Sequence, residues 1–435
     1  MKYGYMFYQK PLISTMKTRP LNIGDPIQSY AVKKLYLEMG IPEEDIIPIP
    51  RYDMSSYNGE ECICVVNTAS NYEELAYSLN FLPPSEKLHI IPISLHIHRS
   101  IPSEELNFYH KCGEVGCRDL STTEYLKSLG INAYLSGCLT LTFPRRSETQ
   151  SKKADKIYFI DIDDSLESYI PDEIREVAIR MSNVVRYNNP GNINRLSVEE
   201  TYGMHFDAEE RIDMLKDTAK LVVTSRLHIA SPCLAMGIPV ILAKKHFGDR
   251  FSFIDRFLPT YTPENYNKIN WNPTPIDFEE EKVIIKNMFF SKVTEMTNRI
   301  ELDKMWKLKK PIFEVAYGTA VATAIRNNLP LLNPKIKYAV WGTVLDNAFY
   351  LEEAMRTQLP ASMLVAGIDI ASTNDFCGVS TINPSQIENL DEDVVIMVAA
   401  PSAQESAVKL LLDTKRKFIL IKETTFEFYN FDNKN

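Results

Sequence analysis

The chain has 435 residues, more than one ordinary hydrophobic core requires, so we expect two or three domains. It carries a net charge of −9, whereas non-specific nucleic-acid binding depends on clustered Lys and Arg, so we expect no nucleic-acid partner. Its seven cysteines are odd in number and include no CxxC pair, which argues against a disulfide framework and against a zinc finger.

No stretch reaches the ~18 consecutive apolar residues of a membrane-spanning helix. The first residues, Met1 to Phe7, also lack the apolar run of a secretory signal. The sequence therefore predicts a cytoplasmic protein.

The first part of the chain alternates short apolar runs with amphipathic stretches, which is typical of α/β folds. We expect a helix from Pro26 to Met39, with Asp25 as its N-cap and Gln28 completing a capping box. A second helix is expected over 121–130. The predicted strands are 2–8, 61–67, 88–95, 115–118 and 131–142. Residues 1–150 are thus predicted to form the first α/β domain.

A polar stretch at 144–155 is typical of a linker, and a second alternation follows it. Helices are expected over 171–182 and 206–217, and a long helical tail over 277–327. The predicted strands are 156–162, 183–187, 220–224 and 238–243. We expect residues 151–330 to form the second domain.

A further break at 328–334 precedes a third alternation, which predicts a small Rossmann-like α/β domain over 335–435. Its expected strands and helices are 337–341, 363–369, 393–399, 417–421, 345–357 and 402–413. Trp341-Gly342-Thr343 has one of the three glycines of a dinucleotide-binding turn, so a structural or docking role is expected instead.

The most informative segment is Ser225-Arg226-Leu227-His228, which follows an apolar strand and precedes a helix of small residues, Gly237 and Pro239. Because Arg226 lies near a helix start, free backbone N–H groups and its own guanidinium could bind an anion. The helix could begin at Ser225 or only at Ser231-Pro232. Taken alone, a surface ion pair for Arg226 and a buried structural role for His228 are the default interpretations.

Two further segments accompany this one in a fixed order. They are Asn22-Ile23-Gly24-Asp25, which opens the first helix, and Cys117-Arg118-Asp119-Leu120-Ser121, which is followed by a helix and Gly137-Cys138. The ordered set spans about residues 20–260. In this respect the chain resembles the polysaccharide pyruvyl transferase family.

That resemblance implies two Rossmann-like domains facing across a cleft, as in glycosyltransferases of the GT-B type. It also implies transfer of pyruvate from phosphoenolpyruvate onto a pair of sugar hydroxyls as a ketal, in exopolysaccharide or cell-surface glycan synthesis. Arg118 and Arg226 match the residues that bind the donor's anionic groups, and His228 matches the catalytic candidate. A lipid-linked oligosaccharide acceptor would bring the protein to the inner membrane face, as a peripheral contact.

Other residues have less specific interpretations. Asn22, Gly24 and Asp25 could be substrate residues or simply a turn and cap, and Lys244, Lys245, His246 and Arg250 could be an anion site or a solvated loop. The run Ser94 to Arg99 replaces a glycine-rich turn of the family, for reasons of packing or of acceptor binding. The acidic residues Asp161, Asp163 and Asp164 are expected to be solvated, so neither a metal nor another cofactor is predicted.

Two alternatives remain open. A glycosyltransferase that uses a sugar nucleotide could have the same fold, since fold alone does not determine activity. It would release a nucleotide, whereas a pyruvyl transferase releases phosphate. The second alternative is a non-catalytic glycan-binding protein, in which the Arg-Leu-His set would have no chemical use.

Overall fold

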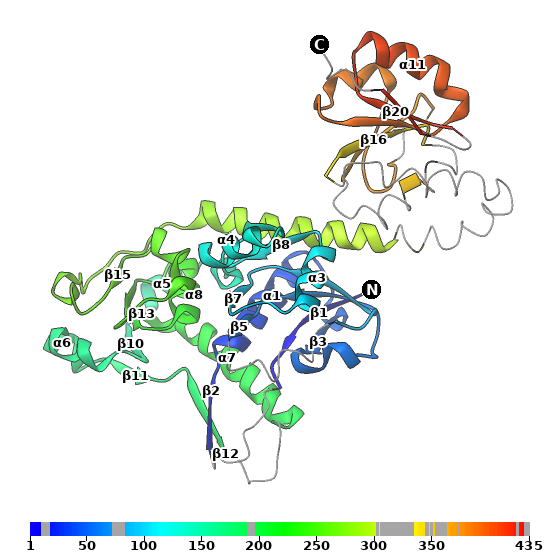
Figure 1. The fold of residues 1–435 in the computed structure, drawn as a ribbon. Coiled ribbons are helices and arrows are strands. Elements are labelled where there is room, and N and C mark those ends of the chain that lie inside the picture. Colours follow the sequence, from blue (N-terminus) through cyan, green and yellow to red (C-terminus); the bar gives the residue numbers. More distant parts are fainter. Residues whose placement is uncertain are drawn as a thin grey trace. The chain divides into compact units, whose positions relative to one another are not determined.

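The computed structural model describes residues 1–9, 18–71, 83–188, 196–301, 304, 335–343, 348, 351–352, 363–371, 375–422 and 426–429. The chain divides into two compact units, Met1–Val293 and Thr294–Asn435. Figure 1 shows their helices and strands in sequence colours. The predicted domain boundaries near residues 150 and 330 stay predictions.

The N-terminal sheet of the first unit contains four parallel strands. Their order is β3 (Ile46–Pro50), β1 (Lys2–Phe7), β4 (Cys62–Val66) and β6 (Leu88–Pro92). All five residues of β4 are buried, as expected for a continuous apolar run in a parallel sheet covered on both faces. The strands predicted at 2–8, 61–67 and 88–95 are confirmed.

Two short strand pairs lie outside this sheet. β8 (Glu114–Cys117) pairs with β9 (Asn132–Leu135), and α4 (Leu120–Ser128) connects them. β7 (His96–His98) pairs with β5 (Ala69–Asn71), and the nine-residue helix α3 is Ser103–Lys111. The strand predicted over 131–142 is therefore right only at its start, because residues Leu139–Thr142 form a 3-10 turn instead.

The second sheet of this unit is also parallel. Its order is β11 (Ile179–Met181), β10 (Lys156–Ile160), β13 (Ala219–Thr224), β14 (Val240–Ala243) and β15 (Thr260–Tyr261). The helices after β12 (Val184–Asn188) and β13 are α7 (Val198–Thr218) and α8 (Leu227–Met236). The strands predicted at 156–162, 220–224 and 238–243 are confirmed.

In this half one predicted helix is wrong, and the stretch predicted as a linker contains a helix. The helix predicted over 171–182 is only α6 (Asp172–Arg175), after which the chain extends to form the edge strand β11. The polar stretch at 144–155 contains a short helix, α5 (Glu148–Lys153), because Ser147 and Gln150 form a reciprocal capping box.

The two sheets of the first unit are joined by secondary structure. β2 (Thr18–Asn22) pairs antiparallel with β12, and the blue and green strands run side by side in Figure 1. α1 (Gly24–Glu38) packs against both α7 and α8. α1 begins before the predicted cap: Ile23 is the N-cap residue, and the Gly24 N–H donates to Asn22 Oδ1 at 3.0 Å. Asp25 therefore lies inside the first turn and does not cap it.

The second unit contains a six-stranded sheet, ordered β18 (Thr381–Ile382), β17 (Met363–Ile368), β16 (Lys337–Trp341), β19 (Val395–Val398), β20 (Phe418–Ile421) and β21 (Phe426–Tyr429). Numbered within the unit, this is the order 3-2-1-4-5-6 of dinucleotide-binding sheets, with β21 antiparallel. The amphipathic helix α11 (Gln404–Asp413) buries Ala407 and Leu411. The four strands predicted here are confirmed.

Two predicted helices are described only in part. Residues 279–301 are helical within the expected tail, and residues 348, 351 and 352 are helical within 345–357. The rest of both predictions lies outside the described residues. Among the described helices, none has the length and apolar character needed to cross a bilayer.

Candidate functional site

Arg118 and His228 are far apart in the sequence but in direct contact. Arg118 follows β8, its side chain is buried, and its Nη1 lies 2.9 Å from Nε2 of His228. Its Nε donates to the backbone carbonyl of Ser94 at 3.4 Å, whereas its buried Nη2 has no hydrogen-bond partner among the described residues. A guanidinium can only donate, so His228 Nε2 accepts and the proton of the neutral imidazole lies on Nδ1.

The start of α8 places His228. The N-cap residue is Arg226, whose N–H donates to Thr224 Oγ1 at 3.0 Å, and the helix begins at Leu227. Neither proposed start, at Ser225 or at Ser231-Pro232, is correct. Pro232 lies inside the helix and has no N–H for the carbonyl four residues earlier, which belongs to His228. His228 accordingly departs from helical geometry, with ψ at 17°.

Arg226 is oriented by Asp161. Its Nε donates to Asp161 Oδ2 at 2.8 Å, and the same carboxylate accepts from the Asn183 N–H and the Ser182 hydroxyl. No described residue hydrogen-bonds the two Nη groups of Arg226, so these donors are available to a ligand. Asp161 is therefore not a solvated carboxylate, contrary to expectation, and Asp163 instead caps the 3-10 turn Asp164–Tyr169.

Lys244 and Arg250 add two more cations after β14. They lie over the ring of Phe251 at 5.5 and 5.3 Å, and neither side chain forms an ion pair or hydrogen bond with the described residues. Burial lowers the pKa of Arg250, and the charges of Arg118 and Arg226 lower it further. Burial, Arg250 and Arg226 likewise lower the pKa of Lys244. Arg118, Arg226, Lys244 and Arg250, which we call the cation cluster, thus repel one another.

The first loop contributes as well. A Cβ on Gly24 would lie 3.0 Å from His228 Nδ1 and 3.1 Å from Asn22 Oδ1, so a larger residue here would press on both side chains. Asp25 supplies negative charge, which partly opposes the lowering of the pKa of both His228 and Arg250. The predicted residues Asn22, Gly24, Asp25 and Lys244 therefore lie at the site. Lys245 is exposed. Hydrogen bonds from Ser165 lower the pKa of Asp163, and the charge of Lys245 lowers it further.

The electrostatics of His228 follow from this setting. Burial lowers the pKa of its imidazole well below the ordinary value, and the positive charge of Arg118 lowers it further. Asp25 opposes this effect without reversing it. The ring is consequently neutral near neutral pH, with its Nδ1–H directed towards the first loop.

The run from Ser94 to Arg99 contains residues whose roles the sequence left open. Ser94 adopts a left-handed conformation, with φ at 63°, where glycine would be typical. Its N–H donates to Ser136 Oγ at 3.0 Å, its Oγ accepts from the Leu139 N–H at 3.3 Å, and its carbonyl receives Arg118 Nε. These three hydrogen bonds offset the strain of a left-handed serine, and the last of them also holds Arg118.

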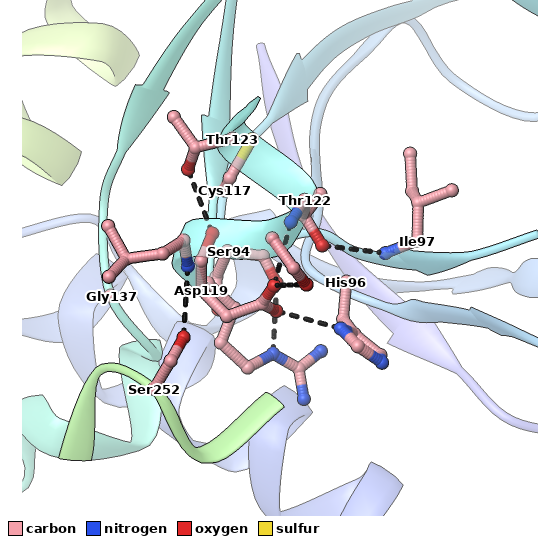
Figure 2. Close-up of polar contacts among 12 residues, drawn as sticks. Ser94, His96, Ile97, Cys117, Asp119, Thr122, Thr123, Gly137 and Ser252 are labelled. Atoms are coloured by element: carbon pink, nitrogen blue, oxygen red, sulfur yellow. Dashed lines mark hydrogen bonds and ion pairs between the residues drawn. The ribbon is translucent and has the colours of Figure 1, made fainter. Parts of the chain in front are cut away.

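His96 and Asp119 form a buried pair beside Arg118. His96 Nδ1 lies 2.7 Å from Asp119 Oδ2, as Figure 2 shows. Asp119 also caps α4 by accepting from the Thr122 N–H at 2.9 Å, and the spacing Asp119-x-x-Thr122 could have predicted that cap. No local pattern could have predicted His96 as its partner.

Comparison with known proteins identifies the family. The model of the family described as "Polysaccharide pyruvyl transferase" matches residues 22–243, just over half of the chain, a range that includes Arg118, Arg226 and His228. No curated protein shows a significant match. A solved structure of a functionally uncharacterised protein from Klebsiella pneumoniae subsp. pneumoniae is 15% identical, covers 59% of this chain and 87% of its own, and has a TM-score of 0.32. The chain belongs to the polysaccharide pyruvyl transferase family.

Proposed function

We propose that this protein transfers the pyruvyl group of phosphoenolpyruvate onto two hydroxyls of a sugar, forming a cyclic ketal. The observation that carries the proposal is the cation cluster of Arg118, Arg226, Lys244 and Arg250. Asp161 pairs with one of the four, and the described residues offer no carboxylate ion pair to the other three. Mutually repelling cations at a sheet edge are unfavourable unless an anion offsets their charge.

Phosphoenolpyruvate has the groups that such a cluster would bind. It carries a carboxylate and a phosphate at opposite sides of a small carbon skeleton, and guanidinium groups bind both through paired hydrogen bonds. The buried Nη2 of Arg118 and the available Nη groups of Arg226 are the donors we assign to it. Arg250 and Lys244 would add charge around the phosphate.

The reaction requires several proton transfers. Two sugar oxygens bond to C2 of the donor, the C2–O bond to phosphate breaks, and the methylene carbon gains a proton to become a methyl group. Of the two protons that leave the hydroxyls, one balances the methyl group and the other leaves with phosphate or solvent. No oxidant, reductant or metal is needed for this balance.

We assign His228 to proton transfer. Beside the cation cluster the imidazole of His228 is neutral, and its Nε2 accepts a hydrogen bond from Arg118. A bound donor anion would offset the charges of Arg118 and Arg250, which raises the pKa of the imidazole, and Nε2 becomes a base once Arg118 turns its Nη1 from the ring to the anion. A positioned histidine of this kind typically contributes roughly 10²–10⁴-fold to the rate.

The remaining parts of the proposal concern the arrangement of the two sheets, the acceptor and the contact with the membrane. The two parallel sheets of the first unit would face each other across the substrate site in a GT-B-like arrangement. The acceptor would be a sugar or a lipid-linked oligosaccharide in exopolysaccharide or cell-surface glycan synthesis. A lipid-linked acceptor would bring the protein into peripheral contact with the cytoplasmic face of the membrane.

The test is incubation with phosphoenolpyruvate and a panel of galactosides, glucosides and N-acetylmannosaminides. We expect acceptor-dependent phosphate release and a ketal product by mass spectrometry. Turnover of sugar nucleotides with release of a nucleotide, and none of phosphoenolpyruvate, would instead identify a glycosyltransferase. Binding of glycans without any turnover would identify a non-catalytic homologue.

A further inference from the structure

We infer that His96, oriented by Asp119, is a second proton-transfer residue of this site and acts as the base for an acceptor hydroxyl. The inference rests on the proposed function. The family match and the Arg-Leu-His segment assign no role to either residue. The inference is carried by the geometry of the pair and by its attachment to Arg118.

The pair fixes the tautomer of His96. Asp119 is fully buried, and its Oδ2 lies 2.7 Å from His96 Nδ1, while its Oδ1 accepts from the Thr122 N–H and the Ser121 hydroxyl. Burial would raise the pKa of this carboxyl, but the hydrogen bonds from His96 and Thr122 hold it below the ordinary value. An ionised carboxylate only accepts, so the proton of neutral His96 lies on Nδ1.

The other ring nitrogen of His96 is consequently a lone-pair acceptor. Figure 2 shows Nε2 pointing away from Asp119, and no described residue hydrogen-bonds it. His228 has the opposite arrangement: its Nε2 is occupied by Arg118 and its Nδ1 carries the proton. With both rings neutral, the described residues thus leave a lone pair on His96 Nε2 and an N–H on His228 Nδ1 without a hydrogen-bond partner.

The two histidines are held by consecutive residues. Arg118 bonds His228 and Asp119 bonds His96, so one short loop after β8 fixes both rings. The backbone of this loop is itself fixed, because the Arg118 N–H donates to the Leu95 carbonyl at 2.7 Å, one residue before His96. When an acceptor hydroxyl gives its proton to His96, Asp119 stabilises the imidazolium that forms. His228 would then be free to serve the carbon or phosphate end of the donor.

The experiment compares three variants with the wild-type protein. His96→Gln removes the base but can still donate to Asp119, and Asp119→Asn keeps a side-chain cap on α4 while favouring the proton on Nε2 of His96. His89→Gln is the matched control, because His89 also pairs with a carboxylate, Glu61, at 2.9 Å, but on the half-exposed surface of β6. Turnover, the KM for phosphoenolpyruvate and the thermal midpoint are measured for each.

We expect kcat to fall roughly 10²–10⁴-fold in His96→Gln and in Asp119→Asn, with the donor KM little changed, and no effect in His89→Gln. Wild-type kcat in folded His96→Gln, or a loss confined to the donor KM, would overturn the inference while leaving the proposed function intact. A wild-type protein inactive with every acceptor would overturn the proposed function, and this inference with it.

A second measurement requires neither a variant nor turnover. The ¹⁵N chemical shifts of the His96 ring report which nitrogen carries the proton. We expect a protonated Nδ1 and an unprotonated Nε2 in the neutral ring. The reverse tautomer would exclude His96 as the resting base, even if His96→Gln does not fold.

Discussion

The two units carry different residues at the carboxyl ends of their parallel strands. At the carboxyl ends of β8, β13 and β14, the first unit places Arg118, Arg226 and Lys244. In the second unit, Gly342 follows β16 with φ at 98°, and a Cβ there would lie 2.2 Å from the Cβ of Ala400, two residues after β19. At this edge the described loops of the second unit therefore close upon each other through small residues and present no cation cluster.

This difference shows that the strand order alone does not decide where cationic side chains gather. The second unit has the order 3-2-1-4-5-6, whose switch point between β16 and β19 is the usual ligand position, and there Gly342 and Ala400 approach each other closely. The first unit instead places side chains at the edge at the expense of backbone strain. Its two described non-glycine residues with positive φ, Ser94 and Asp161, both hydrogen-bond arginines of the cluster.

Replacing His228 by Gln tests the assigned chemistry at this edge and should have the largest effect. Glutamine can still accept from Arg118 Nη1 through its side-chain oxygen but cannot transfer a proton, so we expect kcat to fall roughly 10²–10⁴-fold. Donor affinity, measured by calorimetry, should change little. Full turnover, or a loss only of donor affinity, would contradict the assigned role.

Replacing Arg118 or Arg226 by Ala tests whether the cluster binds the donor. Removing either guanidinium leaves a donor anion without its partner, which should cost roughly 2–5 kcal/mol of binding. Lys should restore only part of it, because a point charge lacks the planar fork of Arg. Arg180→Ala is the matched control, since that exposed arginine already pairs with both oxygens of Glu167. Unchanged donor affinity in both cluster variants would show that the anion binds elsewhere.

The pH response of His228 should be a smaller but more specific effect. Because burial and Arg118 hold its pKa well below the ordinary value, its ring should not titrate between pH 6 and 8 in the free protein by NMR. An anion at the cluster favours the protonated ring, so phosphoenolpyruvate should raise this pKa. Donor affinity should consequently increase as the pH falls through the raised value.

The control for this experiment is the same titration in His228→Gln. That variant keeps the ionisation of the donor phosphate but lacks the imidazole, so the difference between the two pH profiles belongs to His228. A His228 pKa that does not move on donor binding would place the anion away from Arg118.

Much of the site could be predicted because parallel strands bring their carboxyl ends to one edge. Arg118 and Arg226 each follow an apolar strand, as such an edge requires, but it was the resemblance to the family that implied their common location. What could not be predicted is which atoms meet. The Arg226–Asp161 contact depends on a left-handed Asp161, and the His96–Asp119 contact joins residues from different strand pairs.

The errors in the predicted secondary structure also arise from contacts that the sequence pattern does not show. The amphipathic pattern over 171–182 predicted a helix, but pairing with β10 draws residues Ile179–Met181 into the sheet. Asp25 has the spacing of an N-cap, but Asn22 accepts from the Gly24 N–H and the helix begins earlier. A tertiary partner decided the conformation in the first case, and a neighbouring side chain decided it in the second.

The smallest effect should come from removing the second unit. A chain that ends at residue 334 retains all of Met1–Val293, which contains every residue assigned to the donor, the acceptor base and proton transfer. We expect its kcat and donor KM to stay within about twofold of wild type, where a twofold change corresponds to only about 0.4 kcal/mol. Circular dichroism and gel filtration would establish that the shortened chain is folded. If that folded chain were inactive at saturating substrate, the second unit would have to contribute to the site, and the closed edge at Gly342 and Ala400 would no longer mark it as inert.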